Sequence, residues 1–303
     1  MRADLKTRLY GGKGMAFLLL APALTLFLLF QAWPCLDAFW VSLCSWTGFS
    51  PEARFVGAEN YVNLAHDERF LRSVWNTVVF VFLGGVGHFL FAFLFAFALS
   101  HPRFKGKKFF QTMIFFPAFI SVAGVGILWA CLYESKEGLL NQLLNAVGFD
   151  SVTWLDTKNT LALGAIVIAS VWAGVGSQMI VLLAGIKRIP PTYYEAARID
   201  GASEWQTFRM ITLPLLKDVI YVALALWLVG GLQVFGLVQA LAGPTIPLEF
   251  ETVSTYQYAI SFNARDNIYM MGRGTAMALV LAGIIVMVVG GLRLFFGKRE
   301  VEY

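Results

Sequence analysis

The chain has 303 residues, of which 58% are hydrophobic and only 14% are charged. Charged residues make up about 25% of a typical soluble domain, so this composition excludes an ordinary soluble globular protein and indicates an integral membrane protein. The small net charge of +4 fits the charge bias of membrane loops rather than a nucleic-acid-binding surface.

Six apolar stretches are long enough to cross a membrane, because a hydrocarbon core about 30 Å thick takes about 20 helical residues. We therefore expect an all-α polytopic fold with six transmembrane helices, near residues 15–42, 72–100, 109–133, 161–186, 214–242 and 274–296. The first stretch exceeds the roughly 7–15 apolar residues of a signal peptide, so we expect it to be retained. The resulting division is an N-terminal segment (1–14), a transmembrane domain (15–297) and a short tail (298–303).

Basic residues indicate which side of the membrane each loop faces. Most of the 23 Lys and Arg residues fall in the two terminal segments and in the loops 101–108 and 187–218. Cytoplasmic loops of membrane proteins are enriched in Lys and Arg. We therefore expect both termini and these two loops to be cytoplasmic, with lipid surrounding the spans.

The loop at 187–213, between the fourth and fifth spans, is the most distinctive part of the chain. The pair Pro190-Pro191 is expected to end the fourth span, because proline cannot donate a backbone hydrogen bond to a helix. Thr192 and Glu195 match the T-x-x-E capping box. That match predicts a short helix over Tyr193–Ile199.

A turn and a second helix are expected directly afterwards. Gly201 stands where a left-handed residue commonly ends a helix, and Asp200 before it can bond the local backbone. Ser203 and Gln206 form a second capping-box pattern, and Pro214 is expected to open the fifth span. The sequence thus predicts a helix, a glycine turn and a second helix at the membrane surface.

This helical pair could be a docking element for a soluble partner. Ala196 and Ala197 lack bulk, so another surface can approach their backbone closely, and Glu195 offers a charge for a partner's Arg or Lys. Capping boxes are common, however, and a surface hairpin that only closes the loop is an equally good interpretation of the helix signals alone.

The whole pattern is more specific than its helix signals. Glu195-Ala196-Ala197, Asp200-Gly201-Ala202 and Ile211-Thr212-Leu213-Pro214 resemble the EAA motif of binding-protein-dependent ABC importer permeases. The resemblance extends over most of the chain. Within the family, the chain is similar to the carbohydrate-uptake branch, typified by glycerol-3-phosphate and lactose-type importers. It also rests on Asn60-Tyr61, Asn76-Thr77, Pro117, Ser121, Trp129, Gly138, Asn141, Trp154-Leu155 and the tail Lys298–Tyr303. One departure is Ala242-Gly243-Pro244-Thr245, where family members often carry GGP followed by Thr.

The resemblance implies a permease subunit of the bacterial inner membrane that moves a sugar, an oligosaccharide or a sugar-like polyol phosphate by alternating access. In that family this loop holds the coupling helix, which docks on a cytosolic ATPase; the corresponding residues here are Glu195, Ala196, Ala197, Asp200, Gly201 and Pro214. The implied partners are a second permease, two ATP-binding cassette subunits and an extracytoplasmic solute-binding protein. ATP and Mg would bind those ATPase subunits, and we expect no cofactor, no catalytic residue and no nucleic acid on this chain.

The sequence also bears on the energy source. It lacks the G-x-x-x-x-G-K-[ST] pattern of a phosphate-binding loop. An ion-coupled carrier half stays open as an alternative, although such carriers place ionisable groups within the membrane, and we find Asp37 and His88 there but no carboxylate relay. A membrane-embedded enzyme would need convergent reactive groups that the spans barely offer, and a non-transporting scaffold also stays open.

Residues that contact the solute are harder to predict. A neutral sugar needs aromatic faces and uncharged hydrogen-bonding groups. The candidates are Trp172, Ser177 and Gln178 in the fourth span and Gln233 and Gln239 in the fifth. Each could instead bridge two helices or mark the bilayer interface.

Neither the cysteines nor the histidine in the second span predicts a metal site. Cys35, Cys44 and Cys131 are widely spaced, so we expect buried apolar thiols rather than metal ligands or a disulfide framework. His88 is expected to be a packed histidine, since no second ligand lies near it in the sequence.

Overall fold

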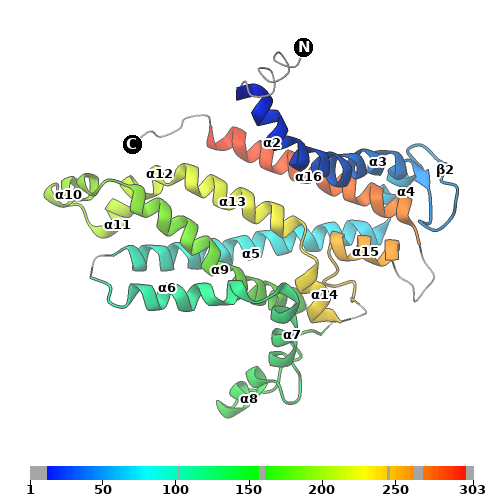
Figure 1. Ribbon diagram of the computed structural model, residues 1–303. Helices are drawn as coiled ribbons and strands as arrows, with labels where there is room; N and C mark the ends of the chain where they lie inside the picture. Colours follow the sequence, from blue (N-terminus) through cyan, green and yellow to red (C-terminus); the bar gives the residue numbers. More distant parts are fainter. Residues whose placement is uncertain (1–11, 102, 157–160, 244–245, 263–268, 298–303) are drawn as a thin grey trace. The chain divides into compact units, whose positions relative to one another are not determined.

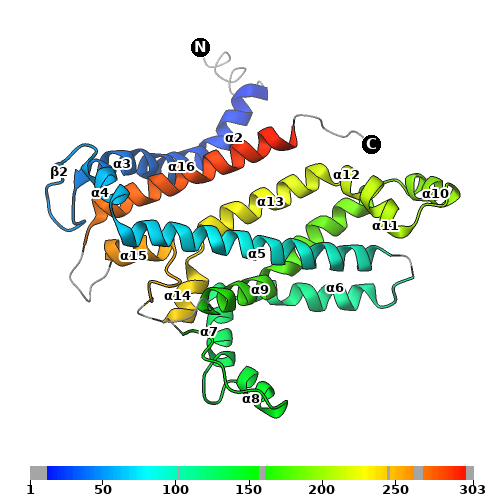
Figure 2. The same cartoon turned by 180° about the vertical axis from the view of Figure 1, so that it is seen from behind.

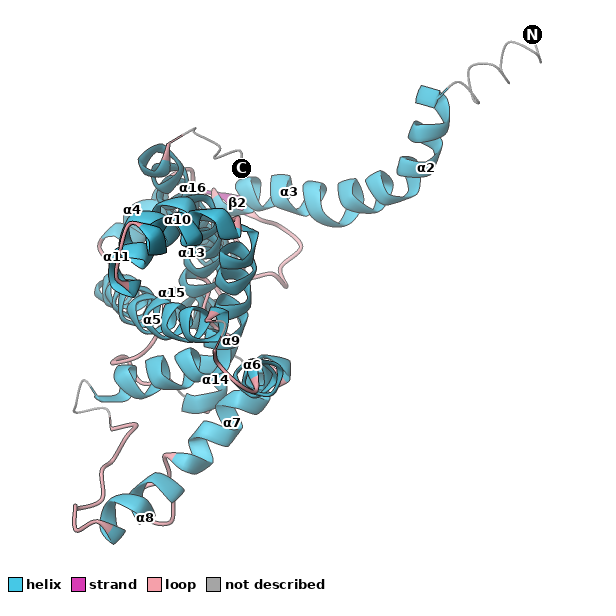
Figure 3. Ribbon diagram, turned by 90° about the vertical axis from the view of Figure 1, so that its left-hand side faces the viewer, coloured by secondary structure: helices cyan, strands magenta, loops and turns pink. Residues whose placement is uncertain are grey.

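The computed structural model describes residues 12–101, 103–156, 161–243, 246–262 and 269–297. The expected N-terminal segment lies largely outside these ranges, and so do Pro244, Thr245 and the tail from Lys298 onward. Helices dominate the described chain, with a single small pair of strands (Figure 3). The chain divides into two compact units, 1–64 with 258–279 and 65–257 with 280–303.

The first unit begins with a long apolar helix. Helix α2 (Gly12–Phe27) continues through one π-helical turn (Leu28–Ala32) into α3 (Trp33–Ser42). Strand β1 (Cys44–Ser45) then pairs antiparallel with β2 (Arg54–Phe55). This pair of strands is a small departure from the expected all-α fold.

A short helix holds the pair of strands in position. Helix α4 (Glu59–Ala65) carries Asn60, whose side-chain amide donates hydrogen bonds to the backbone carbonyls of Ser42 and Cys44 at 2.8 and 2.9 Å. A buried polar side chain that satisfies two backbone acceptors holds the chain in one conformation. These hydrogen bonds, together with the burial of Cys44 and Leu64, therefore order this segment.

The second unit is built around three packed helices. Helix α5 (Glu68–Ser100) is capped by the Asp67 carboxylate, which accepts from the backbone N–H groups of Arg69 and Phe70. It packs with α9 (Leu161–Arg188) and α13 (Lys217–Leu232), and the three run side by side in Figures 1 and 2. Of the two buried apolar clusters in this unit, one joins α5 and α9 and the other joins both helices to residues 125–133 and 237–250.

The expected third span, 109–133, consists of two helices that meet at a sharp bend rather than one straight helix. Helix α6 (Lys107–Phe115) runs into a 3-10 turn (Phe116–Phe119), and α7 (Val122–Leu132) leaves it at an angle of 98°. Pro117 lies at the start of the 3-10 turn, and the Ser121 hydroxyl caps the new helix by accepting from the Gly124 N–H. Both features favour a new helix start.

The expected fifth span is interrupted as well. A π-helical turn (Phe208–Thr212) and α12 (Leu213–Leu215) meet α13 at a 70° bend, so this span does not run unbroken from residue 214. After α13 a separate helix, α14 (Gly236–Ala242), begins. In the described chain, four helices are long and apolar enough to cross a membrane, and six if each bent pair forms one span.

Between α7 and α9 lies a short amphipathic helix, α8 (Leu139–Ala146). Asn141 is fully buried and bonds the backbone on both sides of α8, because its amide donates to the carbonyls of Ser135 and Val152 and its oxygen accepts from the Val152 N–H. Backbone N–H groups of Glu137 and Lys136 hydrogen-bond the Glu134 carboxylate and thereby lower its pKa. Helices α15 (Val253–Phe262) and α16 (Met271–Phe296) complete the described chain.

The cysteines only partly match the expectation of buried thiols. Cys44 is fully buried, but Cys35 and Cys131 are exposed on the surface of the single chain. Both exposed thiols lie on apolar helices, where lipid or another subunit rather than this chain's own core would surround them. The prediction of burial was therefore wrong for two of the three thiols.

Candidate functional sites: a surface hairpin and a central cavity

The first site is the helical pair that follows α9. Helix α9 ends at Arg188, two residues before Pro190, as the two prolines predicted. Helix α10 (Pro191–Ile199) then begins with Pro191 in its first turn and Pro190 as its N-cap. The expected capping box of Thr192 and Glu195 is therefore wrong, because Thr192 lies inside the helix and no side chain caps its start.

The end of α10 is a complete Schellman motif. The N–H of Ala202 donates to the Ala197 carbonyl at 2.9 Å, and the N–H of Gly201 donates to the Arg198 carbonyl at 3.1 Å. Gly201 has φ of +73°, the left-handed conformation that glycine adopts without steric strain. The predicted glycine turn is thus present in the structure.

The second helix of the pair starts with a full capping box. In α11 (Glu204–Thr207), the Ser203 hydroxyl accepts from the Gln206 N–H at 3.3 Å, and the Gln206 side chain accepts from the Ser203 N–H at 2.8 Å. This capping box agrees with the sequence prediction. Pro214 does not open a continuous span, because α12 ends at Leu215 before the bend into α13.

The capping box gives a local stability prediction. Replacing Ser203 by Ala removes the acceptor for the Gln206 N–H and should destabilise α11 by about 1 kcal/mol. Hydrogen exchange should then speed up at the amide of Gln206, while Ser203→Asp, which keeps an acceptor oxygen, should preserve protection. Equal exchange in the Ala and Asp variants would show that the cap does not hold the helix.

Aromatic and polar contacts hold this hairpin, residues 189–213, against the end of the three-helix core. Phe208 makes an edge contact with Phe97 of α5, with ring centroids 5.3 Å apart. Within the hairpin, the hydroxyls of Tyr194 and Thr212 lie 3.3 Å apart. His101, directly after α5, has its Nε2 3.1 Å from a Glu204 carboxylate oxygen. In Figures 1 and 2, α10 and α11 lie at the end of the core where α5 finishes.

The outer face of the hairpin is unusually apolar for a charged loop. Ile199 is 87% exposed, Trp205 66% and Met210 73%. Glu195 and Ala196 are also exposed, whereas Ala197 is buried. Exposed apolar groups bordered by charges are typical of a protein-binding surface, so this arrangement can dock a partner.

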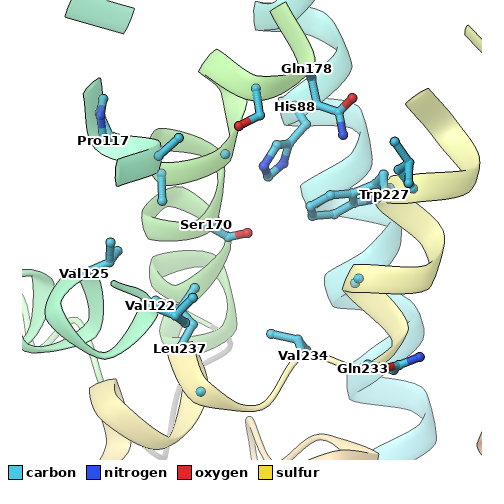
Figure 4. A pocket seen from close by; sticks show the side chains of 18 of the residues that line it. His88, Pro117, Val122, Val125, Ser170, Gln178, Trp227, Gln233, Val234 and Leu237 are labelled. Carbon is cyan, nitrogen blue, oxygen red and sulfur yellow. The ribbon is translucent and has the colours of Figure 1, made fainter. Parts of the chain in front are cut away.

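The second site is a cavity of about 490 Å³ within the second unit. Its lining comes from α5, α7, α9, α13, α14 and the 3-10 turn after α6. Figure 4 shows Trp227, His88 and Gln178 on one side and aliphatic side chains such as Val125 and Leu237 on the other. Its volume lies within the range of about 300–1,000 Å³ that is typical of small-molecule sites.

Three of the five candidate solute-contacting residues line this cavity, namely Ser177, Gln178 and Gln233. Trp172 instead packs edge-on against Trp129, with ring centroids 5.8 Å apart, within an apolar cluster. Gln239 donates to the Gly243 carbonyl at 2.7 Å and stabilises the end of α14. The structure therefore brings together part of the predicted set.

Sequence reasoning missed Trp227 and Ser170 and did not expect His88 to line a cavity. The only sequence signal for Trp227 was the pair Gly84-Gly85, which predicts a close approach without identifying the partner. A Cβ on Gly84 would lie 2.7 Å from Cζ2 of Trp227. His88 packs at 4.1 Å from the Trp227 ring and its Nδ1 lies 2.8 Å from the Gly84 carbonyl oxygen.

A buried polar cluster connects the start of α5 with the segment before α15. Arg69 makes a two-pronged ion pair with Glu251, with both N–O distances 2.7 Å, and its guanidinium lies 4.7 Å from the ring centroid of Tyr256. The Asn76 amide donates to the Glu251 carbonyl at 3.0 Å. Thr252 donates to the carbonyl of Val234, a cavity residue, at 2.9 Å. The cluster therefore positions one end of the cavity wall.

Residues 64–299 match the family described as binding-protein-dependent transport system inner membrane component. The chain belongs to this family. Its members are subunits of ABC importers, so the protein is a membrane permease subunit rather than an enzyme, and family membership gives no support to the ion-coupled alternative. In the described part of the permease, no group of three or more His, Cys, Asp or Glu residues could hold a metal ion.

Individual relatives resemble the permease over most of its length. It is 35% identical over 293 residues to the probable ABC transporter permease protein YurN of Bacillus subtilis, covering 96% of this chain and 98% of the relative. It is 37% identical over 229 residues to the trehalose/maltose transport system permease protein MalF of Thermococcus litoralis, covering 76% and 77%. A solved bacterial alginate ABC transporter, in complex with an alginate pentasaccharide-bound periplasmic protein, superposes with a TM-score of 0.78 at 26% identity, covering 93% of each chain.

Proposed function

We propose that this permease spans the bacterial inner membrane six times and imports a saccharide or a sugar-like polyol phosphate. Each bent helix pair forms one span in this topology, with both termini in the cytoplasm and α10 as a cytoplasmic coupling helix between spans four and five. Up to six spans are possible by length and composition, and the predominance of Lys and Arg in the assigned cytoplasmic segments supports the orientation.

The hairpin of α10 and α11 is the observation that carries this proposal. Its apolar tip at Ile199 projects from a base held by the Schellman motif and by Phe208 against α5. Because its base is held rigidly against the core, a hairpin with an exposed apolar tip can transmit the motion of a bound subunit into the core helices. The subunit that the hairpin would bind is an ATP-binding cassette protein. The assembly would contain two of these proteins, and they would hold ATP and Mg.

A second permease and a solute-binding protein complete the proposed assembly. In the most apolar 18-residue stretch of the Met15–Ser42 helix, no residue is buried within this chain. This leaves a large surface for lipid or for a neighbouring subunit. The solved alginate transporter binds a periplasmic protein that carries its oligosaccharide, and we propose an equivalent partner here.

Alternating access supplies the proposed mechanism. ATP binding closes the ATPase dimer, the docked hairpin moves with its ATPase subunit, and the core helices open the cavity to the outside. ATP hydrolysis and release then return the cavity to the cytoplasm. The ATPase can shift this equilibrium only by binding the two states with different free energies, so a firm hairpin contact is required.

Crosslinking tests the position of the hairpin. In a Cys35→Ala/Cys131→Ala background, Ile199→Cys should crosslink to the ATPase subunit in membrane vesicles, and the yield should change with ATP. A matched control is Val147→Cys, an exposed apolar residue that is expected outside the cell. Labelling of Ile199→Cys by an impermeant maleimide from outside, or no crosslink to an ATPase, would contradict the proposal.

A further inference from the structure

One wall of the cavity combines a fixed aromatic ring with uncharged polar groups. Trp227, His88 and Gln178 come from three different helices and gather on the same side (Figure 4). Ser170 of α9 also lines the cavity, and the aliphatic wall opposite comes largely from α7 and α14. A ring surface facing a few hydrogen-bonding groups is the arrangement that recognises a small amphipathic solute.

The structure fixes the indole of Trp227 in position. Its Nε1 donates to the Val81 carbonyl at 3.1 Å, so its polar atom is already satisfied within the protein. A Cβ on Gly85 would lie 2.8 Å from that nitrogen, which shows how closely α5 holds the ring. The part of the indole that is left to face the cavity is apolar ring surface. The C–H faces of a sugar pack on such surfaces.

Gln178 supplies an unused hydrogen-bond acceptor. Its side-chain Oε1 is buried and has no hydrogen-bond partner among the described residues. An acceptor that is buried without a partner is unfavourable unless a ligand or water supplies a donor. A hydroxyl group of the solute is such a donor, and Ser177 and Gln233 add further uncharged partners in the lining.

The lining also bears on the charge of the solute. None of the described side chains that line the cavity is Asp, Glu, Lys or Arg. A carboxylate or phosphate that entered against this wall would lose hydration and would meet no Lys or Arg, His88 being the only titratable side chain among the described lining residues. An uncharged polyhydroxyl ring would lose far less, because the wall offers it neutral hydrogen-bonding partners.

We propose that this wall accepts an uncharged saccharide and disfavours sugar phosphates and uronates, with Trp227 as the ring platform and Gln178 as a hydroxyl acceptor. This inference rests on the proposed import function and narrows its solute class. It concerns the surface that this permease contributes to the pathway.

Matched neutral and anionic probes test the charge preference. The complete importer with its solute-binding protein, reconstituted in proteoliposomes, is assayed for ATP-dependent uptake of trehalose against trehalose 6-phosphate and of other di- and trisaccharides against their uronate forms. The neutral member of the transported pair should be carried at least tenfold faster. Equal or faster uptake of the anionic member would overturn this inference and leave the import function intact, whereas no ATP-dependent uptake of any probe would overturn the import function itself.

Variants of the wall test the two assigned residues. Gln178→Leu and Trp227→Ala should each raise the KM for the neutral probe about five- to tenfold, as expected for a lost hydrogen bond or ring contact. Trp227→Phe keeps an aromatic ring and should retain most of the affinity even if the Ala variant fails to assemble. Gln142→Leu on α8 and the exposed Trp75→Phe on α5 are matched controls that should leave KM unchanged. An unchanged KM in Gln178→Leu, or in a Trp227→Ala variant that assembles, would overturn the assignment of this wall.

Discussion

Replacing Gly201 by valine is expected to lower solute-stimulated ATP hydrolysis of the assembled importer by about tenfold or more. Gly201 has φ of +73°, and a side chain in the left-handed region costs about 1–2 kcal/mol, more for a β-branched residue. A difference of about 1.4 kcal/mol is a factor of ten in an equilibrium. The strain would fall on the Schellman motif that ends α10 and would move Ile199 out of its docking position.

The surroundings of Gly201 make this test specific to the backbone. A Cβ at Gly201 would meet no atom within 4 Å, so valine acts through φ and not through a clash. Asn tolerates the left-handed conformation, and Gly201→Asn should therefore retain most of the coupling. Gly148 is a matched position, because it has φ of +88° and a Cβ there would also meet no atom within 4 Å. It lies in the loop after α8 that is expected outside the cell, so Gly148→Val should leave coupling unchanged.

The measurement is ATPase activity with and without the solute-loaded binding protein, together with membrane insertion and subunit co-purification. Loss of stimulation in Gly201→Val, with normal assembly, is the expected result. Full stimulation in that variant would show that the hairpin end does not need its left-handed turn for coupling.

The hairpin shows how far local sequence rules reach. The left-handed Gly201 and the Ser203 capping box follow from side-chain and backbone preferences over a few residues, and the structure contains both. The Thr192 prediction was wrong because a residue before proline is driven to the extended region. Pro190 therefore takes the N-cap position with ψ of 135°, and Thr192 lies two residues after it, too far into the helix to cap.

The broken spans and the cavity lie beyond those rules. Apolar composition continues through Pro117 and Leu216, so a hydropathy pattern cannot show that the helix axis turns by 98° in one place and by 70° in the other. Trp227 and His88 are far apart in the sequence, and they meet because Gly84 and Gly85 let the indole lie against α5. Such a contact depends on helix packing, which a single sequence does not specify.

The Arg69–Glu251 pair is a further feature that no local pattern indicated, and its removal is expected to have the largest effect on stability. The Glu251 side chain is 2% exposed, whereas Arg69 is 43% exposed, so the loss of Arg69 leaves a buried carboxylate without its counter-charge. Breaking a fully buried pair in this way costs about 3–5 kcal/mol, and the partial exposure of Arg69 places the expected cost at the lower end of that range. Arg69→Met should therefore lower the thermal unfolding midpoint of the purified permease assembly by on the order of 10 °C.

A double variant separates the lost charge from lost packing. Arg69→Met/Glu251→Gln removes both charges and should recover most of the stability, since replacing a whole buried pair is often nearly neutral. Arg72 and Glu249 form the matched control: their atoms are 3.8 Å apart and both side chains are substantially exposed. Arg72→Met should cost at most about 1 kcal/mol. Equal destabilisation by the single and the double variant would show that Arg69 acts through its packing on Tyr256 rather than by neutralising Glu251.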